Sequence, residues 1–205
     1  MRKEKKKFYL KKLKSGLVNF NMNEKDILEL IEKDPWMMEA LKVASKLDLP
    51  GWMIGAGFVR NKVWDYLHGF ENSVVPTNDI DLIYFDPENL DEEQEKEFDK
   101  ILKEKLNINW SCKNQARMHT EYGDAPYKNT EEALSRWVET ATAVAVRLEK
   151  GELKLFAPHR IDDLVNLILR PTPKFSVPEL LPVFKERVKK KGWLKQYPKL
   201  RVAYN

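Results

Sequence analysis

The chain of 205 residues contains a single cysteine, Cys112, and only three histidines. One cysteine excludes an intrachain disulfide, which is typical of a protein from a reducing compartment. His119 and His159 have no Cys or His partner at zinc-binding spacing, so we interpret neither as a metal ligand. No apolar run approaches the roughly eighteen residues that a membrane span needs, and the basic N-terminus lacks the apolar segment of a signal peptide. We therefore expect a cytoplasmic protein with no membrane partner.

The charged residues are unevenly distributed, although the net charge is only +4. Residues 1–14 contain eight Lys or Arg and one Glu, and residues 185–201 contain the same numbers. Each end therefore carries +7, and the middle of the chain carries −10. The basic ends could contact nucleic-acid phosphates, or they could be solvated tails. The acidic middle suits a metal site.

The most informative stretch lies between residues 52 and 86. Gly55 and Gly57 belong to a Gly-Ala-Gly turn that follows an apolar run and opens a helical pattern. Asp79 and Asp81 follow in a second apolar segment. Alternate side chains of a strand share a face, so this spacing predicts that the two carboxylates lie side by side. The opposite, buried face is expected to carry Ile80, Leu82 and Tyr84.

These residue types suggest a metal and nucleotide site. Two adjacent carboxylates repel each other unless a cation lies between them, and oxygen ligands suit Mg²⁺ or Mn²⁺. The N–H groups of a glycine turn at a helix N-terminus can bind phosphate. Arg60, one helical turn after Gly57, could reach back to a triphosphate or could pair with a surface acid. The sequence thus predicts a site for a divalent metal and a nucleoside triphosphate.

Other interpretations of the same motifs stay open. A Rossmann dinucleotide site also places Gly-x-Gly after a strand with an acid downstream. Here Arg60 occupies the third glycine position, and such a site needs one acid rather than two. The glycines could also form a plain tight turn, and two acids on an edge strand could be ordinary surface residues.

The motifs resemble those of the nucleotidyltransferase superfamily. Their style is similar to the Gly-Gly-x-x-Arg-Asp and Asp-Ile-Asp of poly(A) polymerases and CCA-adding enzymes. Residues 113–119, 137–143 and 170–173 resemble a narrower group, a small bacterial nucleotidyltransferase-like family whose substrates are largely unknown. The resemblance spans residues 35–175. Asn61 departs from the motif, which has Asp at that position.

Further binding candidates follow the second motif. Lys113, Asn114, Gln115 and Arg117 suit contacts to phosphate, base or acceptor, although they could simply be a polar strand end. The resemblance implies a site-lining role for Glu139, for which a hydrogen-bonded corner is the alternative.

A third carboxylate is missing from its expected position. The superfamily usually places one on a neighbouring strand, as a metal ligand or as a base for the acceptor hydroxyl. The matching residues 110–117 include Ser111 but no Asp or Glu. Glu121, Asp124 or Glu139 could substitute for it.

The predicted fold is α+β, with a nucleotidyltransferase-like small mixed β-sheet flanked by helices. Hydrophobic residues make up 42% of the chain, with six Trp and nine Phe, which is enough for the core of one domain. We expect a basic extension over residues 1–22, the nucleotidyltransferase-like domain over 23–175, and a basic helix and tail over 176–205.

Local signals place most elements. Helix starts are predicted at Asn23 and at Asp34, which precedes Pro35, and helix ends at Gly69 and Gly192. The other predicted elements are a polar loop over 70–78, strands over 79–85 and 108–118, a hairpin of 144–148 with 153–156, a helix over 162–169 and a last helix from Ser176.

The sequence therefore predicts a metal-dependent nucleotidyltransferase that moves a nucleotidyl group from a nucleoside triphosphate to an unidentified acceptor hydroxyl. ATP is the first candidate for the triphosphate. The alternative is a catalytically weak or inactive module that binds nucleotide or RNA on the same fold. The missing third acid and the basic ends favour that alternative.

Overall fold

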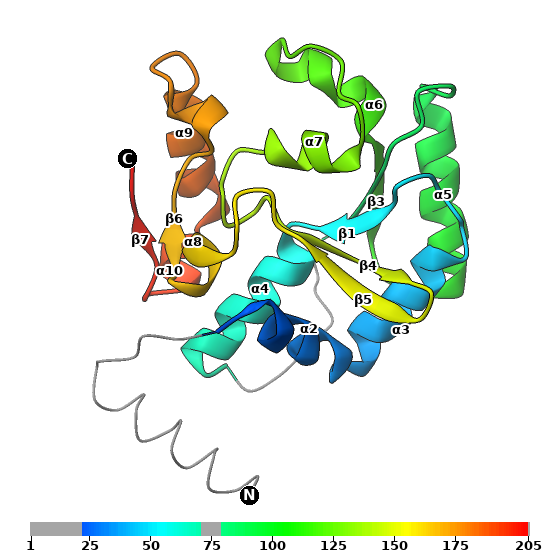
Figure 1. Cartoon of the computed structure of the whole chain (residues 1–205), viewed down its shortest axis with the longest axis horizontal. Coiled ribbons are helices and arrows are strands. Elements are labelled where there is room, and N and C mark those ends of the chain that lie inside the picture. Colours follow the sequence, from blue (N-terminus) through cyan, green and yellow to red (C-terminus); the bar gives the residue numbers. More distant parts are fainter. Residues whose placement is uncertain (1–21, 71–78, 205) are drawn as a thin grey trace, which may run out of the picture.

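A computed structural model of the protein describes residues 22–70 and 79–204 (Figure 1). The basic extension predicted for residues 1–22 lies outside the described residues apart from Met22. The loop predicted for residues 70–78 also lies outside them apart from Phe70. In the described part of the chain, no helix is long and apolar enough to cross a membrane.

Five strands form a central mixed sheet in the order β3-β2-β1-β4-β5. They are β1 (Met53–Gly55), β2 (Ile80–Tyr84), β3 (Trp110–Asn114), β4 (Ala145–Glu149) and β5 (Glu152–Phe156). Strands β2 and β3 are parallel and are joined through helix α5 (Glu92–Lys105), whereas the other neighbours are antiparallel. This arrangement confirms the predicted α+β class, and the predicted hairpin is present as β4 and β5.

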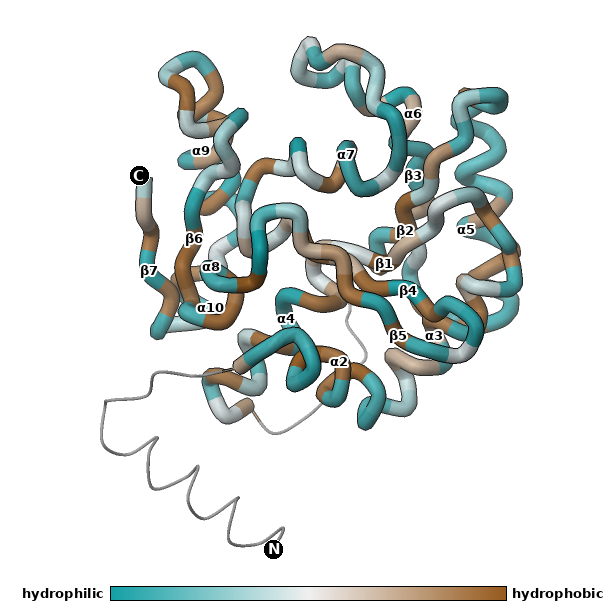
Figure 2. Tube along the Cα trace, in the orientation of Figure 1, coloured by the Kyte–Doolittle hydropathy of each residue, from teal (hydrophilic) through white to brown (hydrophobic). Residues whose placement is uncertain are grey.

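The two faces of the sheet bury different hydrophobic clusters. The main core includes α5 and three further helices: α2 (Glu24–Glu32), α3 (Pro35–Ser45) and α4 (Gly57–His68). As the alternation predicted, this core contains Ile80, Leu82 and Tyr84 of β2. On the other face, Met53 and Ile83 pack with Leu134 of helix α7 (Thr130–Ser135). Figure 1 shows α2, α3 and α4 on one side of the sheet and α7 on the other, and Figure 2 shows hydrophobic segments in the strands and in α2 and α3.

Capping residues fix several helix ends where they were predicted. The side chain of Asn23 accepts a hydrogen bond from the N–H of Asp26, and the Asp26 carboxylate accepts one from the N–H of Asn23. This capping box starts α2. Gly69 (φ 74°) ends α4, and Gly192 (φ 64°) ends helix α9 (Leu181–Lys191), because glycine adopts the left-handed conformation without a steric cost.

Helix α3 starts at Pro35 with Asp34 as its N-cap residue, as predicted, but the Asp34 side chain makes no capping hydrogen bond. The carboxylate is buried and lies against the ammonium group of Lys62 on α4. Because a buried carboxylate needs a cation or hydrogen bonds, this ion pair takes precedence over the cap and links the start of α3 to α4.

The strand predicted for residues 108–118 is shorter than expected. It ends as β3 at Asn114, and the chain continues into the short helix α6 (Gln115–Met118) and the 3-10 turn η1 (His119–Tyr122). The side chain of Asn114 accepts a hydrogen bond from the N–H of Ala116 (3.1 Å) and starts the helix. The polar residues after Asn114 therefore lie on a helix rather than on a strand.

The C-terminal residues form a second, two-stranded sheet that the sequence did not predict. The helix predicted for residues 162–169 ends early as α8 (Asp162–Val165), because Leu167 adopts φ 58° and cannot continue it. Residues Ile168–Leu169 instead form β6, which pairs in parallel with β7 (Arg201–Val202). The helix expected from Ser176 begins later, as α9, after the 3-10 turn η2 (Pro173–Ser176), and α10 (Trp193–Gln196) follows it.

Candidate active site

The turn between β1 and α4 has its strained backbone at an alanine. Ala56 is the N-cap of α4 and adopts φ 51° and ψ −120°, a conformation that costs a non-glycine residue roughly 1–3 kcal/mol. Gly55 and Gly57 have no positive φ and are required for space. A Cβ on Gly55 would lie 3.0 Å from the Trp137 ring, and one on Gly57 would lie 3.3 Å from the Asn61 side chain. The glycines therefore let other side chains close tightly on the turn.

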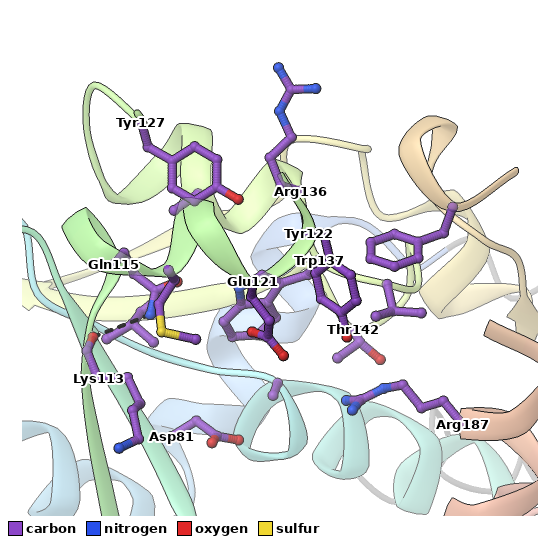
Figure 3. A pocket seen from close by; sticks show the side chains of 16 residues that line it. Asp81, Lys113, Gln115, Glu121, Tyr122, Tyr127, Arg136, Trp137, Thr142 and Arg187 are labelled. Carbon is purple, nitrogen blue, oxygen red and sulfur yellow. Dashed lines mark hydrogen bonds between the residues drawn. The ribbon is translucent and has the colours of Figure 1, made fainter. Parts of the chain in front are cut away.

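Asp81 lies on β2 at the wall of a cleft next to this turn (Figure 3). Asp79 immediately precedes the strand and is exposed. Burial raises the pKa of the Asp81 carboxyl, the positive charges of Arg60, Lys191 and Arg187 oppose this effect, and the negative charge of Asp79 adds to it. The charge of Asp79 thus acts on Asp81 together with those of three cations, and of the two predicted metal ligands only Asp81 lines the cleft.

The chemistry of this pair fits a divalent cation. Mg²⁺ is usually held by one or two carboxylates, and substrate phosphates and water complete its octahedron. A cation would relieve both the desolvation of Asp81 and its repulsion by Asp79. Across residues 22–70 and 79–204, no group of three acidic, His or Cys side chains could hold a metal. The remaining ligands would therefore come from substrate and water.

The cleft beside Asp81 has a volume of about 270 Å³. Two of the predicted binding residues, Lys113 and Gln115, line it. Four aromatic side chains also line it, namely Tyr122, Tyr127, Trp137 and Phe175. Arg136 and Arg187 add positive charge, and Figure 3 shows Arg136 above the cleft and Arg187 on the side opposite Lys113. An aromatic wall with cations at its edges is suited to a nucleotide.

Arg60 is almost fully buried, with 6% of its surface exposed, and does not line the cleft. Its Nη1 donates to the Thr142 hydroxyl (3.1 Å), and its Nε and Nη2 donate to the Asn61 amide oxygen (3.2 and 3.0 Å). The guanidinium also lies over the rings of Trp193 (4.5 Å) and Trp64 (5.2 Å). Burial lowers the pKa of Arg60 to about 10, so it stays charged at neutral pH. Asn61, where the motif has Asp, still supplies the acceptor that Arg60 needs.

Three of the predicted polar residues bind a buried acid that the sequence did not reveal. Glu95 of α5 is 1% exposed and accepts hydrogen bonds from Lys113 (2.9 Å), from the N–H of Asn114 (2.8 Å) and from Arg117 (2.8 and 2.9 Å). The Asn114 amide also donates to the carbonyl oxygens of Asp86 and Asn89. Asn114 therefore ties β3 to α5 and Arg117 ties α6 to α5, whereas Lys113 both pairs with Glu95 and lines the cleft.

The position of the missing third carboxylate is occupied by Ser111. It lies opposite Asp81 in the register between β2 and β3. Of the three acids that could substitute, Glu121 lines the cleft, and Figure 3 shows its carboxylate directed into it. Glu121 comes from the 3-10 turn after α6, so it approaches the site from the other wall.

The other two substitute acids are engaged elsewhere. Asp124 pairs with Lys174 and accepts a hydrogen bond from the Tyr127 hydroxyl (2.6 Å). Glu139 is fully buried, with Arg187 Nε 2.9 Å from its Oε1. It does not line the cleft, and its negative charge acts on both Arg187 and Arg60.

The fold agrees with the similarity of this chain to known proteins. Residues 42–202 match the family model described as Nucleotidyltransferase, and the chain belongs to that family. A protein whose NMR structure is described as revealing a CCA-adding enzyme head domain is 31% identical, with a TM-score of 0.80 over 90% of this chain and 98% of the other.

A more distant likeness is to the Thermotoga maritima CCA-adding enzyme complexed with tRNA, at 18% identity and a TM-score of 0.50. It covers 86% of this chain but only 42% of that enzyme, so it bears on the fold alone. None of the curated proteins matches the chain.

The sequence did not indicate two of the charged residues that shape the site. Glu95 is one of several acids in its helix, and nothing in the pattern marks it as the buried one. Arg187 stands in a lysine-rich run, where its only distinction is that it is an arginine. The Trp137 side chain could have been noticed, because it falls within a segment that carries the family resemblance.

Asp81→Asn should raise the melting temperature of the ligand-free protein near neutral pH. The pKa of Asp81 is raised in the folded state, so the folded protein binds its proton more tightly than the unfolded chain. The protonated Asp81 carboxyl therefore does not destabilise the fold at low pH. As pH rises through the raised pKa, the carboxyl ionises, and the buried negative charge then lowers the free energy of unfolding. The difference between variant and wild type should shrink as the pH falls toward about 4. Thermal unfolding at both pH values measures this, and a lower melting temperature of the variant at neutral pH would contradict it.

Glu95→Gln should cost roughly 1–3 kcal/mol of unfolding free energy at neutral pH, because the neutral amide weakens the charge-assisted hydrogen bonds that the buried carboxylate accepts from Lys113, Asn114 and Arg117. Burial opposes ionisation of Glu95, but hydrogen bonds from Arg117, Asn114 and Lys113 outweigh it and lower its pKa. The contribution is therefore present at neutral pH and is lost as pH falls through the folded pKa. Urea unfolding measures the change. Glu97→Gln, on the exposed side of the same helix, is the matched control and should change stability by at most about 0.5 kcal/mol.

Ala56→Gly should stabilise the protein by about 1 kcal/mol, because relief of the left-handed strain exceeds the entropy cost of glycine. Ala40→Gly in α3 is the control and should destabilise by about 1 kcal/mol, since Ala40 has ordinary helical geometry. Equal losses for both variants in chemical denaturation would show that the turn is not strained.

Proposed function

We propose that the protein is a metal-dependent nucleotidyltransferase that transfers a nucleotidyl group from a nucleoside triphosphate to an acceptor hydroxyl and releases pyrophosphate. The observation that carries this proposal is that Asp81 and Ala56, the N-cap of α4, line the same aromatic cleft, with Asp79 two residues before Asp81. Membership of the nucleotidyltransferase family supports the reaction class.

The phosphates would lie between the two aspartates and the start of α4. Asp79 and Asp81 would hold Mg²⁺ (or Mn²⁺), which when bound neutralises charge on the α-phosphate and orients the acceptor. The first N–H groups of α4 lack partners within the helix and attract the outer phosphates. Gly55 and Gly57 keep this turn compact, and Arg60 supports it from behind, acting by charge and not by direct contact. Lys113 adds a cation at the cleft wall.

The nucleobase would occupy the aromatic part of the cleft. Tyr122 and Trp137 offer ring faces for stacking, which every base can use, and the amide of Gln115 and the guanidinium of Arg136 offer hydrogen bonds to its edge. ATP is the first candidate. Asn114 and Arg117 would position these groups through Glu95 without touching the nucleotide.

The acceptor hydroxyl needs a group that takes its proton. Glu121 is suited to this role because its carboxylate faces the cleft (Figure 3). A carboxylate within hydrogen-bond reach of the hydroxyl can act as a general base.

A second function is favoured by Ser111, which stands opposite Asp81 where a third acid would complete the metal site. In that case the protein would hold nucleotide or RNA on the same fold without chemistry. RNA binding that weakens steeply with salt, together with an absence of pyrophosphate release, would favour this function over the first.

Nucleotide binding tests the proposal most directly. Thermal unfolding of the wild type is measured with each of the four ribonucleoside triphosphates, with and without Mg²⁺. A ligand that binds only the folded state raises the melting temperature by mass action. At a ligand concentration one hundred times its Kd, the free energy of unfolding increases by about 2.7 kcal/mol. We expect a Mg²⁺-dependent shift for at least one triphosphate.

The matched variants are Asp79→Asn with Asp81→Asn, and Glu97→Gln with Glu104→Gln as the control pair, two exposed acids of α5 that do not line the cleft. The first pair should abolish the Mg²⁺-dependent shift, and the second should retain it. Absence of a shift with every triphosphate in the wild type would refute the triphosphate site.

A further inference from the structure

Glu139 carries a buried charge that lacks hydrogen bonds. It is 0% exposed, and neither carboxylate oxygen accepts a hydrogen bond from a described residue. The Nε of Arg187 lies 2.9 Å from Oε1, but its N–H is not aligned for a hydrogen bond. A buried carboxylate without hydrogen bonds is costly. Glu139 and Arg187 therefore attract each other by charge, without the hydrogen bonds that a structural ion pair normally has.

Arg187 lies between Glu139 and the cleft. It lines the same cleft as Asp81, and Figure 3 shows its guanidinium pointing into that cleft beneath Thr142. The group carries five N–H donors in a planar fork, and no hydrogen bond within the described residues uses its Nε. It also lies 5.8 Å from the centre of the Trp193 ring, which supports its orientation.

Helix α9 also carries a second cation, Lys191, which is exposed and does not line the cleft. Lys191 follows Arg187 by four residues, so the two side chains share one face of the helix. The positive charges of both act on Asp81. α9 thus places Arg187 in the cleft with Asp81 and adds the longer-range charge of Lys191, which suits a ligand with several negative charges.

We propose that Arg187, contributed by α9, binds the triphosphate of the nucleotide, and that buried Glu139 holds it by charge when no nucleotide is bound. This inference rests on the proposed function, since it requires a triphosphate beside Asp81. Arginine suits the role because its fork can form two parallel hydrogen bonds to phosphate oxygens. Glu139 and the ligand then compete for one guanidinium.

The competition predicts opposite effects for the two members of the pair. Arg187→Gln removes the phosphate contact and should weaken triphosphate binding. Glu139→Gln removes the competing charge but keeps the side-chain volume, and it should strengthen triphosphate binding. A purely structural ion pair predicts that both variants lose stability and binding together.

The experiment is calorimetric titration of the full chain in Mg²⁺ with ATP, ADP, AMP and adenosine, or the same series of the preferred base. Arg187→Gln should lower the affinity for ATP roughly tenfold to a hundredfold, lower that for AMP less, and leave that for adenosine unchanged. Arg187→Lys should lose part of the ATP affinity, because its point charge cannot form the fork. Glu139→Gln should raise the affinity for ATP.

Lys185→Gln is the matched control for charge. Lys185 is exposed on the same helix, with its ammonium 5.4 Å from the ring of Tyr204, and it does not line the cleft. The variant removes the same charge from α9 and should bind ATP like the wild type. Melting temperatures of all variants report whether each is folded.

The outcomes separate this inference from the proposed function. If the wild type binds ATP and Asp81→Asn abolishes binding but folded Arg187→Gln and Arg187→Lys bind like the wild type, Arg187 has no phosphate role and the nucleotide site stands. If Glu139→Gln weakens binding as much as Arg187→Gln, the pair is structural. If Arg187→Gln weakens only the binding of a short ribo-oligonucleotide, the residue serves acceptor phosphates and the triphosphate assignment is wrong. No binding of any triphosphate to the wild type overturns both proposals.

Discussion

The buried guanidinium of Arg60 is the interaction on which the site depends. It sits behind the Gly-Ala-Gly turn and joins three separate parts of the chain: Asn61 on its own helix, Thr142 before β4, and Trp193 after α9. A buried charge is costly unless its partners surround it, so these segments must assemble together. The first turn of α4, the wall of the cleft and the C-terminal helix are consequently fixed relative to one another by one side chain.

Around the cleft, burial disfavours the charged forms of Asp81 and Arg60, whereas neighbouring groups of opposite charge favour them. Burial raises the pKa of Asp81 and lowers that of Arg60, and each group offsets part of the other's cost. Glu139 and Arg187 form a second pair of opposite charges, with Arg187 Nε 2.9 Å from Glu139 Oε1. A site with such uncompensated charge is less stable than a fully paired one, and the missing compensation is what a metal and a polyanion can supply.

The elements that local chemistry determines were predictable, whereas those that depend on distant partners were not. The alternation in β2 and the capping box at Asn23 follow from neighbouring residues, so both are as expected. The early end of β3 depends on how the Asn114 side chain bonds, and β6 forms only because residues 201–202 pair with it. Likewise, the sequence predicts Lys113 as a binding residue. Its hydrogen bond to Glu95 could not be predicted, because it depends on how α5 packs against β3.

The dependence of the cleft on α9 and α10 has a consequence for biosynthesis. All five strands of the central sheet are complete once residue 156 has been made, so the sheet can pair while the chain is still attached to a ribosome. The cover over Arg60 comes from Trp193, and the helix that carries Arg187 is anchored by the pairing of β6 with residues 201–202. A nascent chain can therefore possess the sheet and its aspartates without possessing a finished cleft, and the site is completed only after residue 202 has been made.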